Sequence, residues 1–258
     1  GHDTTYDHMF LDGLEDAYEE GRAMGTFAQE TADEYQLTRE DMDEYSIESL
    51  RRANAAIESG AFDGEVIPVA IVTRKGETLV EHDEAPGKGK PDKIPQLRPA
   101  FAKDGTITAA TSSSISDGAA AVVLSRESVA KKNGQTPVAK IVGLAAHAQE
   151  PSKFTVAPIG AIEKLLEQTG WSADEVDLWE VNEAFACVAM FAMRDIGIPH
   201  DKININGGGT ALGHPIGASG TRIIVTLLNA LKQQGKKRGI ASLCIGGGEA
   251  TAVAVEMV

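Results

Sequence analysis

The sequence is poor in cysteine and in positive charge. Its 258 residues include only two cysteines, which excludes a disulfide framework and favours a reducing, cytoplasmic setting. Lysine and arginine number 24 against 38 aspartates and glutamates, so the net charge is −14. Nucleic acids and anionic membranes bind basic surfaces, and neither is expected as a partner of so acidic a chain.

Long apolar runs and metal-binding patterns are also lacking. No run approaches the roughly 20 apolar residues that a membrane span requires. The histidines are scattered and have no cysteine partners at ligand spacing, so no metal site is expected. No complete dinucleotide or phosphate-loop fingerprint occurs either, and no cofactor is expected.

The first 115 residues have an irregular pattern. Residues 38–60 predict a helix that Thr38 and Asp41 cap and Gly60 ends. Residues 65–83 predict two short strands around a turn, and residues 84–99 predict a loop rich in proline, glycine and lysine. This pattern is typical of an inserted domain rather than of a regular layer of helices or strands.

The rest of the chain alternates between segments with the hydrophobic pattern of strands and segments with that of helices. Strands are predicted at 119–125, 138–145, 177–181, 203–205, 240–245 and 250–258, and helices at 158–170, 184–195 and 218–233. Strands that alternate with helices favour a layered α/β domain whose sheet is covered on both faces.

Polar groups follow the predicted strand 177–181 in the motif WEVNEAFA, residues 179–186. The carboxyl ends of strands are where α/β proteins build their sites, and Asn182 stands there. On this motif alone, a simple helix cap is the favoured role for Asn182, and orienting a water in a site is the alternative.

Two glycine-rich motifs carry a histidine and a cysteine. In NGGGTALGHPIGASG, residues 206–220, His214 stands on a stiff corner between Gly213 and Pro215, which favours a function over an incidental surface position. In LCIGGG, residues 243–248, Cys244 ends a strand. A small apolar residue and a reactive thiol beside free backbone N–H groups are equally good interpretations of Cys244.

Together, NEAFA, GGGTALGHPIGASG and CIGGG, in this order and at these separations, resemble the thiolases, and the likeness extends over the whole chain. The resemblance implies an α/β fold with a layered α/β/α/β/α core and an inserted α+β loop domain. It implies a loop domain over 1–115, a return segment of the N-terminal core domain over 116–136, and a C-terminal thiolase domain over 137–258, with the N-terminal half of the core largely absent.

The resemblance also implies an enzyme that exchanges acyl groups between coenzyme A thioesters. This is an acetyl-CoA C-acetyltransferase or 3-ketoacyl-CoA thiolase of fatty acid metabolism, for which acyl-CoA and CoA are substrates. His214 matches the residue that activates the nucleophile, Asn182 the residue that holds an oxyanion-hole water, and Cys244 the acid/base. The Gly246 N–H matches an oxyanion donor. The residues that match the coenzyme A tunnel are Met24, Ser113 and Phe185.

One further contact is predicted from charge. Lys88 belongs to a local basic cluster, completed by Lys90, Lys93 and Arg98, in a chain that is otherwise acidic. We expect this cluster to meet the anionic end of coenzyme A, although for any single lysine a solvated loop is the favoured interpretation.

The nucleophilic cysteine of thiolases lies in an N-terminal segment that the resemblance does not place in this chain. Cys187 does not replace it, because it follows NEAFA where the family has a small residue. We therefore expect the protein to be completed by that segment as a partner and to form a homodimer or homotetramer. The alternative is a non-catalytic acyl-CoA-binding or scaffolding module derived from a thiolase.

Overall fold

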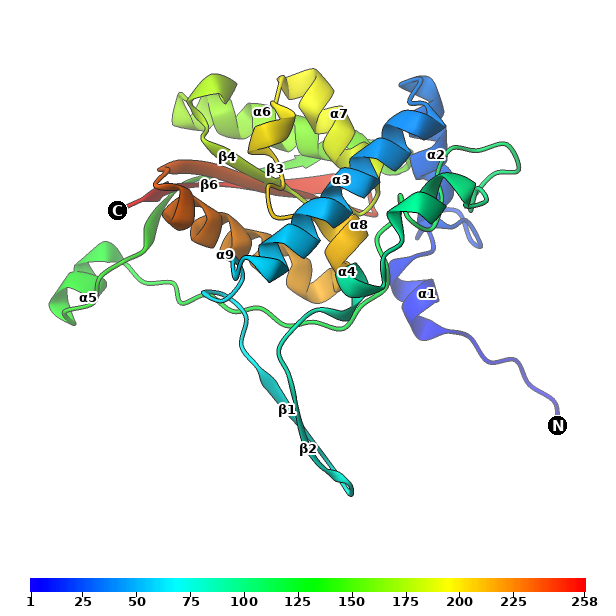
Figure 1. Cartoon of the computed structure of the whole chain (residues 1–258). Helices are drawn as coiled ribbons and strands as arrows, with labels where there is room; N and C mark the ends of the chain where they lie inside the picture. Colours follow the sequence, from blue (N-terminus) through cyan, green and yellow to red (C-terminus); the bar gives the residue numbers. More distant parts are fainter.

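A four-stranded sheet forms the centre of the molecule (Figure 1). The computed structural model describes residues 1–258. The strand order is β3 (Ala139–Ala148), β6 (Glu249–Met257), β5 (Arg238–Ile245) and β4 (Leu178–Val181). Strands β3, β6 and β5 pair antiparallel, whereas β4 pairs parallel to β5. All four residues of β4 are buried, as expected for a strand covered on both faces.

Helices cover both faces of the sheet and make three layers (Figure 1). Helix α6 (Ala157–Thr169) packs on β3 and β6 beside α7 (Ala186–Ile196), and α9 (Ile216–Gln234) packs on β5 and β4. Helix α6 has Pro158 in its first turn, where no backbone donor is lost, and ends at Gly170 in the left-handed conformation. The predicted α/β class is confirmed. None of the helices combines the length and the apolar character needed to cross a membrane.

Two further helices, α2 (Met24–Glu34) and α3 (Arg39–Glu58), pack against this unit. Thr38 caps α3 through a capping box with Asp41, as predicted. One face of α3 is buried and contacts the segments that carry the candidate site. Residues on this face include Met42, Tyr45, Ser49, Ala53 and Ala56.

The predicted hairpin is present as β1 (Val69–Thr73) and β2 (Gly76–Val80), which pair antiparallel. Every residue of both strands is exposed, and the hairpin projects away from the rest of the molecule (Figure 1). The remaining elements are single turns. They are α1 (His8–Gly13), α4 (Glu84–Lys88), η1 (Pro91–Gln96), α5 (Glu127–Lys132), η2 (Pro151–Val156), η3 (Ala173–Glu175), η4 (His200–Lys202) and α8 (Gly209–Leu212).

Three local predictions are wrong. Residues 119–125 form no strand, because no neighbouring strand pairs with them. Residues 203–205 make one isolated bridge, from Ile203 to Trp179, because Asn204 takes a positive φ of 46° that ends the extended run. The loop predicted at 84–99 contains two short helical turns, α4 and η1.

Candidate functional site

Asn182 lies directly after β4 and does not cap a helix. Its backbone N–H donates to the Ser242 carbonyl at 2.9 Å, which continues the pairing of β4 with β5 by one residue. Helix α7 begins at Ala186 with Phe185 as its N-cap, so the helix-cap interpretation of Asn182 is wrong. The Asn182 Nδ2 atom lies 3.3 Å from the His214 Nε2 atom, and the Asn182 Oδ1 atom is buried without a partner.

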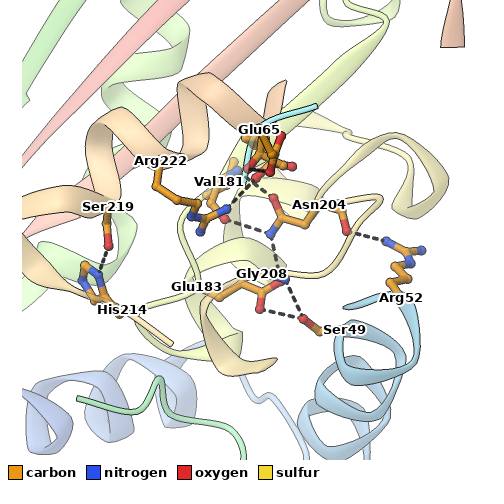
Figure 2. A network of polar contacts seen from close by, with 12 residues as sticks. Ser49, Arg52, Glu65, Val181, Glu183, Asn204, Gly208, His214, Ser219 and Arg222 are labelled. Atoms are coloured by element: carbon orange, nitrogen blue, oxygen red, sulfur yellow. Dashed lines mark hydrogen bonds and ion pairs between the residues drawn. The ribbon is translucent and has the colours of Figure 1, made fainter. Parts of the chain in front are cut away.

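His214 is held on three sides. Its backbone N–H donates to the Ser114 carbonyl at 3.0 Å, and its Nδ1 atom lies 2.5 Å from the Ser219 Oγ atom (Figure 2). The Ser219 hydroxyl donates its own proton to the Pro215 carbonyl at 3.0 Å. Ser219 Oγ is therefore the acceptor for His214 Nδ1–H, and this assignment leaves the lone pair on Nε2, facing the Asn182 amide.

The electrostatic surroundings keep this imidazole neutral. Burial, with the Arg222 charge as a second contribution, lowers the pKa of His214 to about 4. At neutral pH the ring therefore presents an uncharged nitrogen that is free to take a proton.

Cys244 is the second titratable group of the candidate site. It stands one residue before the end of β5, in the same core cluster as Met24 and Phe185. Burial raises the pKa of the Cys244 thiol to about 12, so the group is protonated at neutral pH. Gly246 follows in the turn to β6, and its N–H makes no hydrogen bond within the protein.

The predicted tunnel residues come together around these groups. Met24 reaches Gly246 so closely that a Cβ on Gly246 would lie 2.9 Å from the Met24 sulfur. Phe185 forms a bridge with Ser112, and the next residue, Ser113, donates from both its N–H and its Oγ to the Ala184 carbonyl. Residues 112–114 therefore run from the NEAFA motif to His214.

Lys88 lies apart from the other predicted site residues. It is exposed on α4 and its ammonium lies 2.6 Å from the Glu84 carboxylate. Helix α4 packs near α8 and α3, and no contact joins Lys88 to the groups described above.

The glycines around His214 serve mainly the packing of the protein. A Cβ on Gly208 would lie 2.3 Å from the Glu183 carboxyl carbon, so only glycine allows this approach. Gly213 has a φ of +93°, and a Cβ there would lie 2.2 Å from the Ser116 hydroxyl. Close packing against Glu183 and Ser116 thus fixes the conformation of the loop that carries His214.

Glu183 is the functional neighbour that the sequence did not reveal. Its carboxylate is fully buried and accepts five hydrogen bonds from three segments distant in the sequence, and Figure 2 shows Ser49 and Asn204 beside it. The donors are Tyr45 Oη (2.8 Å), Ser49 Oγ (2.8 Å), Asn204 Nδ2 (2.9 Å), Thr210 N–H (3.1 Å) and Thr210 Oγ1 (2.7 Å). The hydroxyl-bearing face of α3 was the one available signal for this buried carboxylate.

The structure is an α/β protein in which Asn182, paired with His214, and Cys244 lie at the ends of two neighbouring strands, β4 and β5. Two family models match the chain, "Thiolase, N-terminal domain" over residues 1–128 and "Thiolase, C-terminal domain" over residues 135–257. The chain belongs to the thiolase family.

Curated relatives agree with this assignment. A probable acetyl-CoA acetyltransferase of Dictyostelium discoideum is 46% identical over 257 residues, which cover 99% of this chain and 62% of the relative. The acetyl-CoA acetyltransferase of Escherichia coli is 45% identical, with coverage of 99% and 65%. The chain therefore spans slightly less than two thirds of the length of these relatives.

Solved structures give the same result. The acetyl-CoA acetyltransferase of Bacillus anthracis superposes with a TM-score of 0.96 at 39% identity, covering 100% of this chain and 65% of that one. The Acat5 thiolase of Ascaris suum, solved in complex with coenzyme A, gives 0.90 at 39% identity, with coverage of 100% and 66%. These matches confirm the predicted thiolase-like fold.

Replacing Glu183 by alanine is expected to destabilise the protein by about 3 to 5 kcal/mol, because several buried donors lose their acceptor at once. Urea unfolding of the parent and the variant measures this loss. Glu163→Ala, on the exposed face of α6, is the matched control and should change the unfolding free energy by less than about 0.5 kcal/mol. Equal stability of the two variants contradicts the role given to Glu183.

His214 is expected to make the stability depend on pH between about 6.5 and 4. The unfolded imidazole binds a proton below about 6.5, whereas the folded one binds it only below about 4. The unfolding free energy therefore falls as the pH falls through this window, by about 3 kcal/mol from this group. Unfolding curves of the parent and of His214→Ala should diverge there, while a control at the exposed His2, His2→Ala, should follow the parent.

Proposed function

We propose that the protein is the part of a thiolase that carries the acid/base groups and contributes to two oxyanion sites. The reaction is the condensation of two acetyl-CoA to acetoacetyl-CoA, or the reverse thiolysis of a 3-ketoacyl-CoA by CoA. One observation carries this proposal: the neutral imidazole of His214 faces Asn182, within a fold that places the protonated Cys244 thiol at a neighbouring strand end.

The nucleophile in this scheme is a cysteine from a segment outside these 258 residues. Cys187 is unsuited to the role, because it is fully buried on α7 and burial raises the pKa of its thiol. Cys244 is occupied by the proton transfers described next. The resemblance to whole thiolases supports a companion segment that bears the reactive thiol.

In the first half-reaction, His214 Nε2 takes the proton of the nucleophilic thiol, whose sulfur attacks the thioester carbonyl. Cys244 gives its proton to the departing CoA sulfur and becomes a thiolate. In the second half-reaction, this thiolate removes an α proton from a second acetyl-CoA, and the enolate attacks the acyl group. The nucleophile leaves as a thiolate and regains its proton from His214, so all protons are returned.

Two oxyanion sites stabilise the charges that develop at the carbonyl oxygens. The unpaired Gly246 N–H supports one of them, beside the acyl-enzyme. A water held by the Asn182 amide, together with His214, makes the other; the unpartnered, buried Asn182 Oδ1 supports this water. Met24, Ser113 and Phe185 line the approach of the pantetheine arm, and the basic cluster with Lys88 meets the anionic end of coenzyme A.

The proposal extends to the setting of the protein. Its two free cysteines support a reducing compartment, the cytoplasm, and the reaction belongs to fatty acid metabolism. The exposed apolar residues of the hairpin support assembly as a homodimer or homotetramer; Val72, for example, is 76% exposed. Coenzyme A thioesters act as substrates, and no cofactor takes part in the scheme.

Acetoacetyl-CoA thiolysis tests the proposal. We expect the 258-residue chain alone to be inactive and poorly soluble, and activity to appear when it is co-expressed with a polypeptide matching the first third of its bacterial relatives. A companion whose cysteines are all replaced by serine serves as the control. Turnover by the lone chain, or by the cysteine-free pair, overturns the assignment of the nucleophile.

In the active pair, His214→Ala and Cys244→Ala are expected to fail at different steps. Without His214, acylation by radiolabelled acetyl-CoA should fall by about 100-fold or more, because a thiol of pKa about 8.5 is mostly protonated at neutral pH. Without Cys244, acylation should remain measurable while deuterium exchange at the α carbon disappears. If Cys244→Ala exchanges the α proton at the parent rate, Cys244 is not the base.

A further inference from the structure

A partly buried polar stripe runs along α9 and begins with Ser219, the residue that contacts His214. Its members recur at intervals of three and four residues, so they share one face of the helix. They are Ser219, Arg222, Thr226 and Asn229. Ser219 contacts the candidate catalytic imidazole, Arg222 contacts β4, and Thr226 and Asn229 contact the segment 61–65 after α3.

Arg222 connects this stripe to the strand that carries Asn182. Its Nη1 atom lies 3.4 Å from the Glu180 Oε2 atom, and the Glu180 side chain is only 2% exposed. Glu180 precedes Asn182 by two residues and lies on the same side of the chain, while Arg222 follows Ser219 by three residues on the same helix face. Two links therefore join the end of β4 to α9, one from Asn182 through His214 to Ser219 and one from Glu180 to Arg222. Figure 2 shows the His214–Ser219 contact and Arg222 on the same helix.

The charge of Arg222 is incompletely matched. Its Nη2 atom is buried and has no hydrogen-bond partner. Glu65, drawn beside it in Figure 2, accepts from Thr226 Oγ1 at 3.0 Å through one carboxyl oxygen, and its other oxygen is buried without a partner. The charged groups around this point are Glu180 and Glu183 from β4 and the loop after it, Glu65 and Asp83 from the two sides of the hairpin, and Arg222 itself.

We propose that Arg222, anchored on Glu180, is a positioning residue for His214: it fixes the first turns of α9 against β4 and so sets both hydrogen-bond neighbours of the imidazole. This inference rests on the proposed function for its link to catalysis, but not for its effect on the imidazole. The same guanidinium opposes the addition of a second proton to the ring.

The electrostatics agree with this geometry. After burial, Arg222 is the other contribution that lowers the pKa of His214. Burial raises the pKa of Glu180 to about 8, against the opposing effect of Arg222, and burial also raises the pKa of Glu65. Since both carboxyls resist ionisation, they leave part of the Arg222 charge directed at His214.

Histidine NMR without substrate tests the inference, on the 258-residue chain co-expressed with the companion polypeptide described above. Spectra of ¹⁵N-histidine-labelled parent and His214→Ala assign the ring, and its nitrogen shifts report its protonation and tautomer. Arg222→Gln is expected to raise the titration midpoint of His214 by about one pH unit and to mix the Nδ1–H and Nε2–H tautomers. Arg222→Lys, which keeps the charge, should hold the midpoint near the parent value.

Arg39→Gln is the matched control, because the Arg39–Asp43 pair on α3 is equally buried, with side-chain exposures of 21% and 6% against 20% and 2%. A folded Arg222→Gln whose His214 titrates as in the parent overturns the inference, as does an equal shift in Arg39→Gln. Should Arg222→Gln not fold, a raised midpoint in Arg222→Lys overturns the part assigned to charge. None of these outcomes depends on thiolase activity, so failure of the proposed function is a separate result.

Discussion

The buried carboxylate of Glu183 is the interaction on which the rest of the site depends. Removing a carboxylate from water costs several kcal/mol, which only a full set of donors offsets. Those donors come from α3, from Asn204 and from the first turn of α8. Segments that lie up to 138 residues from Glu183 in the sequence must therefore meet at one point, and Asn182, the preceding residue, is fixed there with them.

Burial also sets the protonation states of the two titratable groups of the candidate site, His214 and Cys244. It lowers the pKa of His214 to about 4 and raises the pKa of Cys244 to about 12. Both shifts favour the uncharged form, which makes the imidazole a base and the thiol an acid at the same pH. A thioester exchange needs one group of each kind, because one proton must be removed from the nucleophile while another is given to the leaving sulfur.

Local chemistry explains which parts of the fold were predictable. The capping box at Thr38, the apolar period of α6 and the apolar runs of β5 and β6 depend on neighbours in the sequence, and the structure has them all. The strand predicted at 119–125 is absent because a strand depends on a partner that the run itself does not encode.

In the candidate site, too, some residues could be predicted from local sequence and others depend on distant contacts. His214, Asn182 and Cys244 stand out through their glycine-rich or strand-end surroundings, and the structure brings His214 to Asn182. Glu183, Ser219 and Arg222 look like ordinary surface or cap residues in the sequence. Their roles depend on contacts between segments that are distant in the sequence. Tyr45, for example, lies 138 residues from Glu183 and donates to its carboxylate, and no local sequence pattern predicts such a contact.

The segments that hold the site differ in kind from those that surround it. Asn182, His214 and Ser219 are tied to the core by several hydrogen bonds each, whereas Val123 and Leu124 are 95% and 72% exposed, in a run with no pairing partner. Apolar side chains left in water in this way favour association with another surface. The exposed run lies outside the Glu183 network, and Gly118, just before it, packs close to Pro215 beside His214. The contact between Asn182 and His214 is therefore preorganised by hydrogen bonds within this chain, while the apolar run that follows is left open to another surface.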